Sequence, residues 1–358
     1  MQTIVEQLAV AQAREGFVVF VCAVGGAKDG YHYQNVERLQ YIQFGLSGRN
    51  YASGLARMVR FLRQNQIQIL HAHPGTLSRL AGILAGVPIM ISTLHGSWPT
   101  SNWITRAVHR WLAGRTTRLV ANSSFTRGYY TALLGLDESQ CMTIYNGVDI
   151  RRYTCLDRQN RAAQRTSFRV PVDAKVVVSA GRLHPDKGVD ILISAAAMIG
   201  TQVPNTHFLI VGDGECRREL EQQVMAAGIE AYVHFTGALA DVRPALDAAD
   251  IFVLPSARRE GFGLALVEAM AIGLPVVGTN LGGIPEIVAD GVNGLLATPE
   301  DAGSLTKAIL RLLEAPELAA RLAQNGQQTA RARFSMERMI AEYETLYYSL
   351  LEKPDAGT

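Results

Sequence analysis

The sequence predicts an α/β protein of two doubly wound domains, in each of which helices cover a parallel sheet. Its 358 residues are more than one hydrophobic core usually holds, so two domains are expected. Short aliphatic runs alternate with segments of helical periodicity in both halves of the chain. A polar, weakly patterned stretch, Arg151–Arg169, separates the two series and predicts an interdomain linker.

The first half opens with a predicted helix at Met1–Arg14, ahead of any strand. Strands are then expected at Phe17–Val24, Ile67–Ala72, Val87–Thr93, Arg118–Ala121 and Cys141–Tyr145. Helices are expected between them at Tyr51–Gln64, Thr76–Ala85, Asn102–Ala113 and Ser124–Leu134. A doubly wound domain normally begins with a central strand and a glycine-rich turn. This sequence shows neither, so we expect the first domain to lack its first strand.

The second half repeats the alternation of strands and helices. Its expected strands are Lys175–Ala180, His207–Val211, Tyr232–Phe235, Ile251–Pro255, Pro275–Gly278 and Gly294–Ala297. Its expected helices are Val189–Ile199, Arg217–Ala227, Val242–Ala248, Leu264–Ala271, Ile284–Ala289, Ala302–Glu314, Glu317–Phe334 and Met336–Leu351. We place the first domain at residues 1–165 and the second at residues 166–335. Ligands of such sheets bind at the carboxyl ends of the strands, and two facing domains would form a central cleft there.

Composition and cysteine content indicate a globular protein of the cytoplasm. Hydrophobic residues make up 48% of the chain and charged residues 18%. The four cysteines form no Cys-x-x-Cys pair and no set with zinc-ligand spacing, so we interpret them as reduced thiols. The chain shows neither a signal-type start nor an apolar run of membrane-spanning length, so we expect a cytoplasmic location.

Charge is unevenly distributed along the chain. Residues 1–150 hold 13 basic and 7 acidic residues, and from Leu39 to Leu136 ten arginines occur without one acidic residue. This predicts an anionic partner for the first half, either a phosphate-bearing acceptor or an acidic bilayer surface. We do not expect a nucleic-acid partner. One segment also interleaves aromatic and basic residues, namely Trp98, Trp103, Arg106, His109, Arg110, Trp111, Arg115 and Arg118. Helices at membrane surfaces have this pattern, although a packed or solvated helix can share it.

The stretch from Glu260 to Glu268 is the most informative for chemistry. Gly261 and Gly263 allow the backbone to approach a ligand closely, and a helix beginning near Leu264 would present amide groups to an anion. If the turn at Glu260 is nearly helical, the two carboxylates lie in one sector, two helical turns apart. One carboxylate could then hold sugar hydroxyls and the other ribose hydroxyls. A loop acid and a helix-face acid without function would show the same spacing.

A second candidate loop, Gly181–Gly188, follows a predicted strand and precedes a helix. In it, Arg182 can bind phosphate oxygens in a bidentate manner, and Lys187 can add a point charge at the start of the helix. Such cations stabilise the charge that develops on a leaving diphosphate. A solvated basic loop is the alternative interpretation.

His95 follows a predicted strand and precedes a glycine, a position suited to a cleft, although a structural histidine fits equally well. His71 and His73 flank another strand end, but no carboxylate lies near them in sequence, so we do not expect a metal there. The glycine turns at Val211–Gly214 and Gly282–Glu286 can be ligand loops or plain connections.

Together these motifs resemble the retaining GT-B glycosyltransferases of family 4, the glycosyl-transferase group 1 family. The resemblance runs from about Ile67 to Tyr348 and is strongest in the Glu-x7-Glu segment that follows Pro255. The Gly181–Gly188 loop and Asn146-Gly147-Val148-Asp149 also fit, as do residues 249–256 and 273–277. The resemblance implies the GT-B fold, in which two Rossmann-like domains face a central cleft and the final helix, residues 336–351, packs back on the first domain. Relatives begin with a strand and a Gly-Gly turn, which this sequence lacks.

The resemblance also implies roles for single residues. Arg182 and Lys187, in the loop that starts at Gly181, would hold the donor diphosphate. Glu260 would contact the transferred sugar, and Glu268 the ribose. The backbone of Gly261, Phe262, Gly263 and Leu264 would meet sugar and phosphate, and residues 235–239, with Gly237 among them, would face the base. His95 corresponds to a histidine of the first domain near the reacting centre, so the catalytic candidates are His95, Arg182, Lys187 and Glu260.

We therefore expect a transferase that moves a hexose-type sugar from a nucleotide-diphosphate sugar to a saccharide or lipid-linked acceptor. As the resemblance implies, anomeric configuration would be retained and no metal or other cofactor needed. A role in lipopolysaccharide or exopolysaccharide synthesis is expected, with peripheral contact to the inner face of the membrane. Two alternatives stay open: a protein that binds nucleotide sugars without turnover, because its first strand is missing, and a nucleotide-sugar epimerase of the same fold. The absence of a dinucleotide glycine fingerprint argues against a nicotinamide dehydrogenase.

Overall fold

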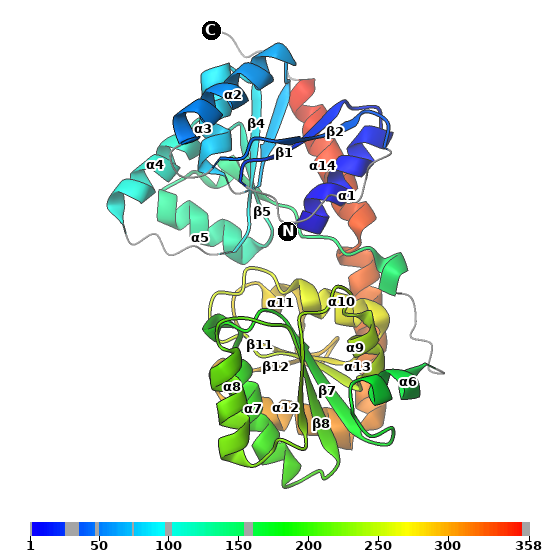
Figure 1. Ribbon diagram of the computed structural model, residues 1–358. Coiled ribbons are helices and arrows are strands. Elements are labelled where there is room, and N and C mark those ends of the chain that lie inside the picture. Colours follow the sequence, from blue (N-terminus) through cyan, green and yellow to red (C-terminus); the bar gives the residue numbers. More distant parts are fainter. Residues whose placement is uncertain are drawn as a thin grey trace. The chain divides into compact units, whose positions relative to one another are not determined.

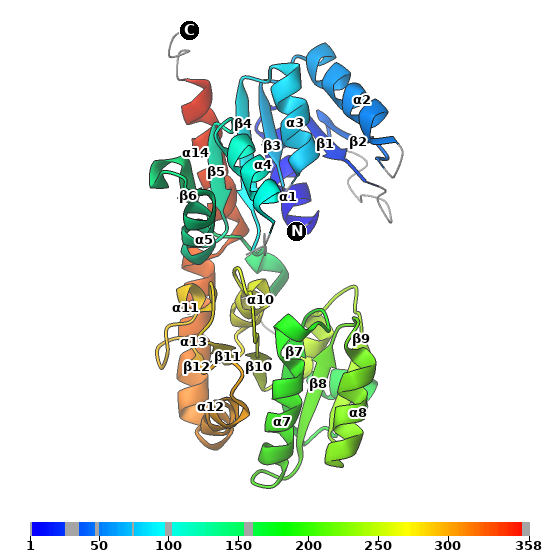
Figure 2. The same ribbon diagram turned by 90° about the vertical axis from the view of Figure 1, so that its left-hand side faces the viewer.

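The computed structural model describes residues 2–25, 36–46, 50–73, 75–96, 102–153 and 160–352. The chain divides into two compact units, one made of Met1–Gly147 with Glu337–Thr358, the other of Val148–Met336. In each unit helices lie on both sides of parallel strands (Figures 1 and 2). The predicted pair of doubly wound α/β domains is therefore confirmed.

The second unit contains one sheet of six parallel strands (Figure 1). The strands are β7 (Lys175–Ala180), β8 (Thr206–Val211), β9 (Val233–Gly237), β10 (Ile251–Leu254), β11 (Val276–Thr279) and β12 (Leu295–Ala297). Their spatial order is β12-β11-β10-β7-β8-β9, so the chain reverses its direction of travel across the sheet between β7 and β10. The carboxyl edge beside such a reversal is where doubly wound sheets bind ligands.

Helices bury both faces of this sheet. They are α6 (Arg161–Ser167), α7 (Val189–Gly200), α8 (Arg217–Ala227), α9 (Arg243–Ala248), α10 (Leu264–Ile272), α11 (Ile284–Ile287), α12 (Ala302–Glu314) and α13 (Pro316–Arg333). Aliphatic residues of α7, α8 and α12 form one core with the strands, and α10 packs with α13. All six residues of β8 are buried, as a continuous apolar run between two helical layers requires.

The first unit has the same plan but a divided sheet. Its strands are β1 (Val19–Ala23), β2 (Leu39–Gln43), β3 (Ile69–Ala72), β4 (Ile89–Leu94), β5 (Arg118–Ala121) and β6 (Cys141–Thr143). Its helices are α1 (Gln2–Arg14), α2 (Tyr51–Gln64), α3 (Thr76–Ala85), α4 (Trp103–Ala113), α5 (Ser124–Leu134) and α14 (Met336–Leu351). β1 pairs with β2, while β3, β4, β5 and β6 form a second sheet, and no strand within the described residues joins β1 to β3. This break agrees with the expectation that a central strand is lacking.

Hydrogen bonds fasten α14 to the strands of the first unit. The hydroxyl groups of Tyr343 and Thr93 lie 2.9 Å apart. His71 contacts Thr93 through Nε2 at 2.7 Å and the Tyr347 hydroxyl through Nδ1 at 2.7 Å. Both ring nitrogens of His71 are therefore occupied, and its role is structural. Residues from Glu337 onward consequently belong to the first unit although they follow the second in sequence.

The junction between the units differs from the sequence-based placement. We expected the boundary after residue 165, whereas the chain divides between Gly147 and Val148. The linker interpretation was wrong for Arg161–Ser167, which form α6 and pack against α9; residues 154–159 lie outside the described residues. Arg165 holds α6 on the second unit. Its buried guanidinium donates to the carbonyl oxygens of three residues and to the Asp250 carboxylate.

Three further findings bear on the sequence analysis. Strand β2 was not predicted, because most of its side chains are exposed and the segment lacks an apolar pattern. Among the described cysteines, Cys22, Cys141 and Cys216 are free, and Cys155 lies outside the described residues. Within the part of the chain that the structure describes, no helix is long and apolar enough to cross a membrane.

The Arg165 network predicts a stability effect. We expect Arg165→Met to lower the free energy of unfolding by about 3 kcal/mol, because it leaves buried carbonyl groups without a donor and removes one of the two guanidinium groups that pair with the Asp250 carboxylate. Urea denaturation followed by circular dichroism measures this. Arg218→Met, on the exposed side of α8, is the matched control and should stay within about 0.5 kcal/mol of the wild type. Equal stability of the two variants would contradict the assigned role of Arg165.

Candidate functional site

The candidate site lies at the carboxyl edge of the second unit's sheet, where the strand order reverses. The loop after β7 and the loop after β10 begin there as neighbours, because β7 and β10 are adjacent strands. Most of the residues singled out from the sequence, from Gly181 to Lys187 and from Glu260 to Leu264, lie in these two loops. Residues 73 positions apart in sequence, Lys187 and Glu260, therefore meet at one edge.

An ion pair joins the two loops. Lys187 Nζ donates to Glu260 Oε2 at 2.7 Å, and the Ser256 hydroxyl donates to the same oxygen at 2.9 Å. Ser256 is itself held by the Thr279 hydroxyl, which donates to its carbonyl oxygen at 2.7 Å. Glu260 is only 8% exposed. A buried carboxylate and a cation are thus fixed side by side at the reversal point.

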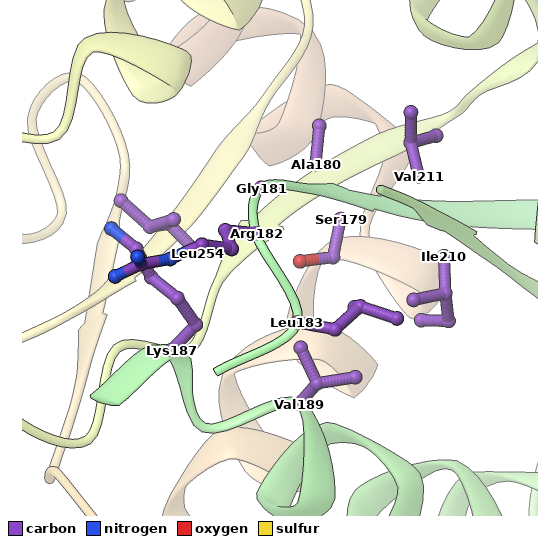
Figure 3. A pocket seen from close by; sticks show the side chains of 10 residues that line it. All are labelled: Ser179, Ala180, Gly181, Arg182, Leu183, Lys187, Val189, Ile210, Val211 and Leu254. Atoms are coloured by element: carbon purple, nitrogen blue, oxygen red, sulfur yellow. The ribbon is translucent and has the colours of Figure 1, made fainter. Parts of the chain in front are cut away.

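Arg182 adds a second cation to this edge. A small pocket at the end of β7 is lined by Arg182 and Lys187 together with Gly181 and the buried Leu183. Figure 3 shows the side chains of Arg182 and Lys187 extending to the same side, away from Ile210 and Val211. The exposed guanidinium and the half-buried ammonium can both reach an anion at this edge.

Glycines allow the loops to pack closely. Gly188, at φ 62°, lies so near the carbonyl oxygen of Pro255 that a Cβ atom would overlap it. Gly282, at φ 60°, lies equally close to the carbonyl oxygen of Glu260, and Gly283 N donates to that oxygen at 3.0 Å. The left-handed backbone and the missing side chain are both required at these positions. The Gly282-Gly283 turn therefore positions Glu260 rather than merely connecting two elements.

The amino end of α10 faces the same edge. Gly263 precedes this helix in a left-handed conformation with φ 99°, and no side chain of the described residues caps the helix start. The amide groups of its first turn and the positive end of the helix dipole suit an anion. Phe262 contributes through its backbone, since its buried ring packs edge-on against Phe334 with the ring centroids 5.6 Å apart.

The assumed helical relation between Glu260 and Glu268 was wrong. Gly263 and Arg259 both have positive φ angles, so the chain from 259 to 263 does not continue the helical path of α10 backward. Glu260 is a loop residue paired with Lys187, and Glu268 is a helix residue with a partner of its own. Each carboxylate thus has a separate environment.

That partner is Tyr153, which the sequence analysis did not single out. The Tyr153 hydroxyl forms a hydrogen bond with the half-buried Glu268 carboxylate. Burial raises the pKa of Glu268, while the hydrogen bond from Tyr153 and the charge of Arg152 act in the opposite direction. Burial and the nearby Glu268 carboxylate raise the pKa of Tyr153, so its hydroxyl keeps its proton at neutral pH. Sequence spacing offered no signal for a contact across 115 residues.

Gly237 ends β9 at the same edge of the sheet. Gly212 N donates to the Gly237 carbonyl oxygen at 2.9 Å, which joins the ends of β8 and β9. Within β9, the Phe235 ring is covered by the Arg217 guanidinium of α8, 4.7 Å from the ring centroid. The end of β9 is thereby fixed against the end of β8 at this edge.

His95 belongs to the first unit, whereas the other predicted site residues belong to the second. It follows β4, and its Nε2 lies 3.2 Å from Nδ1 of His73. Burial lowers the pKa of His95 to about 4 and that of His71 to about 3. His95 is therefore neutral at neutral pH and can donate or accept a hydrogen bond. Within the described residues, no three His, Cys, Asp or Glu side chains are arranged to hold a metal ion.

Comparison with known proteins agrees with this geometry. Residues 160–329 match the family described as "Glycosyl transferases group 1", and residues 1–152 match "Glycosyltransferase Family 4". The UDP-Gal:alpha-D-GlcNAc-diphosphoundecaprenol alpha-1,3-galactosyltransferase of Escherichia coli is 30% identical, over 73% of this chain and 70% of that protein. The N-acetyl-alpha-D-glucosaminyl L-malate synthase of Bacillus anthracis is 27% identical, over 84% of this chain and 80% of that protein.

Solved structures agree as well. HepE of Anabaena, in complex with UDP, superposes with a TM-score of 0.84 at 26% sequence identity, covering 97% of this chain and 96% of that chain. Sequence identity to the galactosyltransferase, both family matches and the two Rossmann-like units lead to one conclusion: this chain belongs to the group 1 glycosyl transferases of glycosyltransferase family 4 and has the GT-B fold.

Proposed function

We propose that this chain transfers a hexose from a nucleotide-diphosphate donor with retention of anomeric configuration. One observation carries the proposal: two cations, a buried carboxylate and the amino end of α10 converge where the second sheet reverses. A diphosphate needs cations and amide donors, and a sugar beside it needs a hydrogen-bond acceptor. This edge offers all three.

In this proposal Arg182 and Lys187 bind the diphosphate oxygens, assisted by the backbone from Gly263 to Leu264. Glu260 accepts hydrogen bonds from hydroxyls of the transferred sugar. Glu268 accepts them from the ribose, and the backbone near Gly237 faces the base. HepE is solved with UDP and with UDP-glucose, and the galactosyltransferase is named for UDP-Gal, so we propose a uridine diphosphate sugar as donor.

The proposed transfer takes place on one face of the sugar. The acceptor hydroxyl forms a bond to the anomeric carbon as the bond to the donor phosphate breaks, and the hydroxyl proton passes to the departing phosphate oxygen. Arg182 and Lys187 stabilise the negative charge that grows on the diphosphate, and neutral His95 serves as a hydrogen-bonding group at the sugar. We propose that these side chains supply the charge compensation, so that no metal is needed.

The proposed acceptor is a saccharide carried on a lipid diphosphate, in the synthesis of a bacterial lipopolysaccharide or exopolysaccharide. The name of the Escherichia coli relative gives a diphosphoundecaprenol-linked acceptor. Ten arginines and no acidic residue occur between Leu39 and Leu136, and this positive charge suits a negatively charged substrate. A protein that binds the donor without turnover is the second candidate, because the sheet of the first unit is interrupted between β1 and β3.

We further propose that α4 contacts an anionic bilayer. Its outward face carries Trp103, Ile104, Val108 and Trp111, all exposed, with Trp103 75% exposed. The Arg115 guanidinium lies 4.2 Å from the centre of the Trp111 ring, next to these apolar groups. Tryptophans beside arginines suit the headgroup region of a membrane with negative lipids. Trp98, part of the same sequence pattern, lies outside the described residues.

The donor site is tested by UDP binding. We expect UDP to raise the melting temperature, and we expect Lys187→Ala to weaken UDP binding about 10- to 100-fold, because one charge-assisted hydrogen bond to phosphate is lost. Turnover with a UDP-hexose should persist in excess EDTA. Lys307→Ala, at an exposed position on α12, is the matched control. A Lys187 variant that binds UDP like the control would remove the basis for the diphosphate assignment, and binding without turnover would favour the second candidate.

The Glu268–Tyr153 contact predicts how UDP affinity depends on pH. The ionised carboxylate accepts hydrogen bonds from ribose hydroxyls better than the neutral acid, so affinity should fall as pH drops through the pKa of Glu268, which burial raises above its ordinary value. Tyr153→Phe removes a group that lowers this pKa, so the fall should begin at a higher pH. Glu268→Gln should bind UDP weakly and without this pH dependence. Calorimetric titrations between pH 4.5 and pH 8 would decide, and identical profiles for wild type and Tyr153→Phe would count against the ribose role.

The membrane contact is tested by sedimentation with vesicles. The wild type should bind vesicles of phosphatidylcholine with phosphatidylglycerol more tightly than pure phosphatidylcholine, and less tightly at high salt. Replacing both Trp103 and Trp111 by alanine should weaken binding at least about tenfold, because each large buried apolar side chain contributes roughly 1.5–3 kcal/mol. Met225→Ala, at a similarly exposed apolar site of the second unit, should bind like the wild type. Unchanged binding of the tryptophan variant would refute the role of α4.

A further inference from the structure

One arginine of the first unit is buried without a counter-ion. Arg79, on α3, is only 5% exposed, and its Nε atom is sealed from solvent without a hydrogen-bond partner. Burial lowers the pKa of Arg79, and among the described residues only Tyr130 acts in the opposite direction, while no carboxylate does. A buried guanidinium whose charge nothing compensates is costly in free energy, so its presence requires an explanation.

The sequence around Arg79 contains no carboxylate. No acidic residue occurs from Leu39 to Leu136, a stretch that includes strands β3, β4 and β5 and helices α3, α4 and α5. Helix α4 lies beside both α3 and α5, and α3 and α5 pack on the strands (Figures 1 and 2). Residues 97–101 lie outside the described residues, but they belong to the same stretch and contain no acid. The elements that surround this guanidinium therefore have no carboxylate to offer it.

Arg165 shows how the same chain treats a buried arginine with a structural role. Its exposed fraction of 6% is nearly that of Arg79, yet its guanidinium donates to three carbonyl oxygens and pairs with the Asp250 carboxylate. None of the described groups does this for Arg79. An apolar side chain of similar volume would fill the place of Arg79 without desolvating a charge. The contrast indicates that Arg79 does not serve the stability of the first unit.

Arg79 lies toward the carboxyl ends of β3 and β4. Gly82 of α3 packs against Leu70 of β3 and Met90 of β4. Because α3 connects two parallel strands, it runs in the opposite direction to them. Arg79 comes one helical turn before Gly82 and is therefore nearer the carboxyl ends of the strands. This is the edge at which doubly wound sheets bind ligands.

Two further polar groups belong to this region. Ser92 follows Met90 by two residues, so its side chain is on the same side of β4, and its buried hydroxyl has no hydrogen-bond partner among the described residues. Burial and the nearby charge of Arg79 lower the pKa of His109 on α4, so this ring is neutral at neutral pH. A guanidinium, a hydroxyl and a neutral imidazole can each donate a hydrogen bond to a phosphate oxygen.

We propose that Arg79 is the anchor of a phosphate-binding site in the first unit, to which Ser92 and His109 contribute hydrogen bonds. The Nε and Nη atoms of one arginine form a fork that matches two oxygens of a phosphate group. The bound anion supplies the counter-ion that the surrounding sequence lacks. Two sources have this chemistry. One is the diphosphate of the lipid-linked acceptor, in which case the inference rests on the proposed function, and the other is a free phosphate ion.

The first measurement is the stability of the full chain in dilute, phosphate-free buffer. Fluorescence reports on the first unit alone, because Trp98, Trp103 and Trp111 are all the tryptophans of the chain and precede residue 148. Arg79→Met should raise the melting temperature of this unit by about 3 °C or more, since an uncompensated buried charge is removed. Arg60→Met, at an exposed position on α2, is the matched control and should melt within about 1 °C of the wild type.

An unchanged or lower melting temperature of Arg79→Met, or failure of this variant to fold, would overturn the proposal. Arg79 would then contribute to the structure of the unit as Arg165 does in the other unit.

The second measurement is the response of the same fluorescence transition to anions at constant ionic strength. Pyrophosphate should raise the melting temperature of the wild type and of Arg60→Met. Arg79→Met should bind it at least about tenfold more weakly, and Ser92→Ala about threefold more weakly, because charge-assisted and neutral hydrogen bonds are lost. The proposal fails if the wild type does not respond or if Arg79→Met responds equally.

Farnesyl diphosphate, a short lipid diphosphate, distinguishes the two sources. Binding that is tighter than that of pyrophosphate and depends on Arg79 assigns the site to the acceptor, whereas equal or weaker binding assigns it to a free phosphate ion. UDP binding by Arg79→Met should equal that of the wild type, because the proposed donor site belongs to the second unit. Failure of the donor site and failure of the Arg79 site are therefore seen separately.

Discussion

The ion pair between Lys187 and Glu260 is the interaction on which the rest of the candidate site depends. It closes the point where a six-stranded parallel sheet reverses its strand order, and it joins the loop after β7 to the loop after β10. The cation and the carboxylate neutralise each other in a place where Glu260 is almost fully buried. A diphosphate at this edge would offer Lys187 a second anion and leave Glu260 free to accept hydrogen bonds from a sugar. The contact thereby holds the cation and the carboxylate of the proposed donor site side by side.

Close backbone packing supports that contact. Gly188 and Gly282 have no side chain, so the loop backbones come into direct contact. Gly283 N donates a hydrogen bond to the Glu260 carbonyl oxygen and so fixes its position. Ser256 and Thr279 add hydrogen bonds from the ends of β10 and β11. Glu268 depends on a different support, the Tyr153 hydroxyl, which comes from the segment that enters the second unit. The two carboxylates are thus held by separate neighbours, which suits two separate tasks.

The two units share one architecture, but among the described residues only the second unit has a single continuous sheet. In the second unit the central strand β7 is buried on both faces, and its carboxyl end carries the candidate site. In the first unit the corresponding place is a cavity bordered by strand edges, and apolar residues of β1 stay accessible to solvent. The second unit therefore has a continuous core of its own, whereas the described strands of the first unit form two separate sheets.

The sequence by itself determined the alternation of strands and helices and the loops that carry Arg182, Lys187, Glu260 and Gly263, because periodicity and turn glycines are local signals. It failed where local signals were weak or misleading: polar α6 resembled a linker, exposed β2 had no pattern, and the left-handed Gly263 broke the assumed helical phase between the two glutamates. Only the tertiary structure decided that Lys187 pairs with Glu260, that Tyr153 holds Glu268 and that β1 borders a cavity. Each of these joins residues far apart in the chain, and such contacts follow from strand order and packing, which no local pattern of residues specifies.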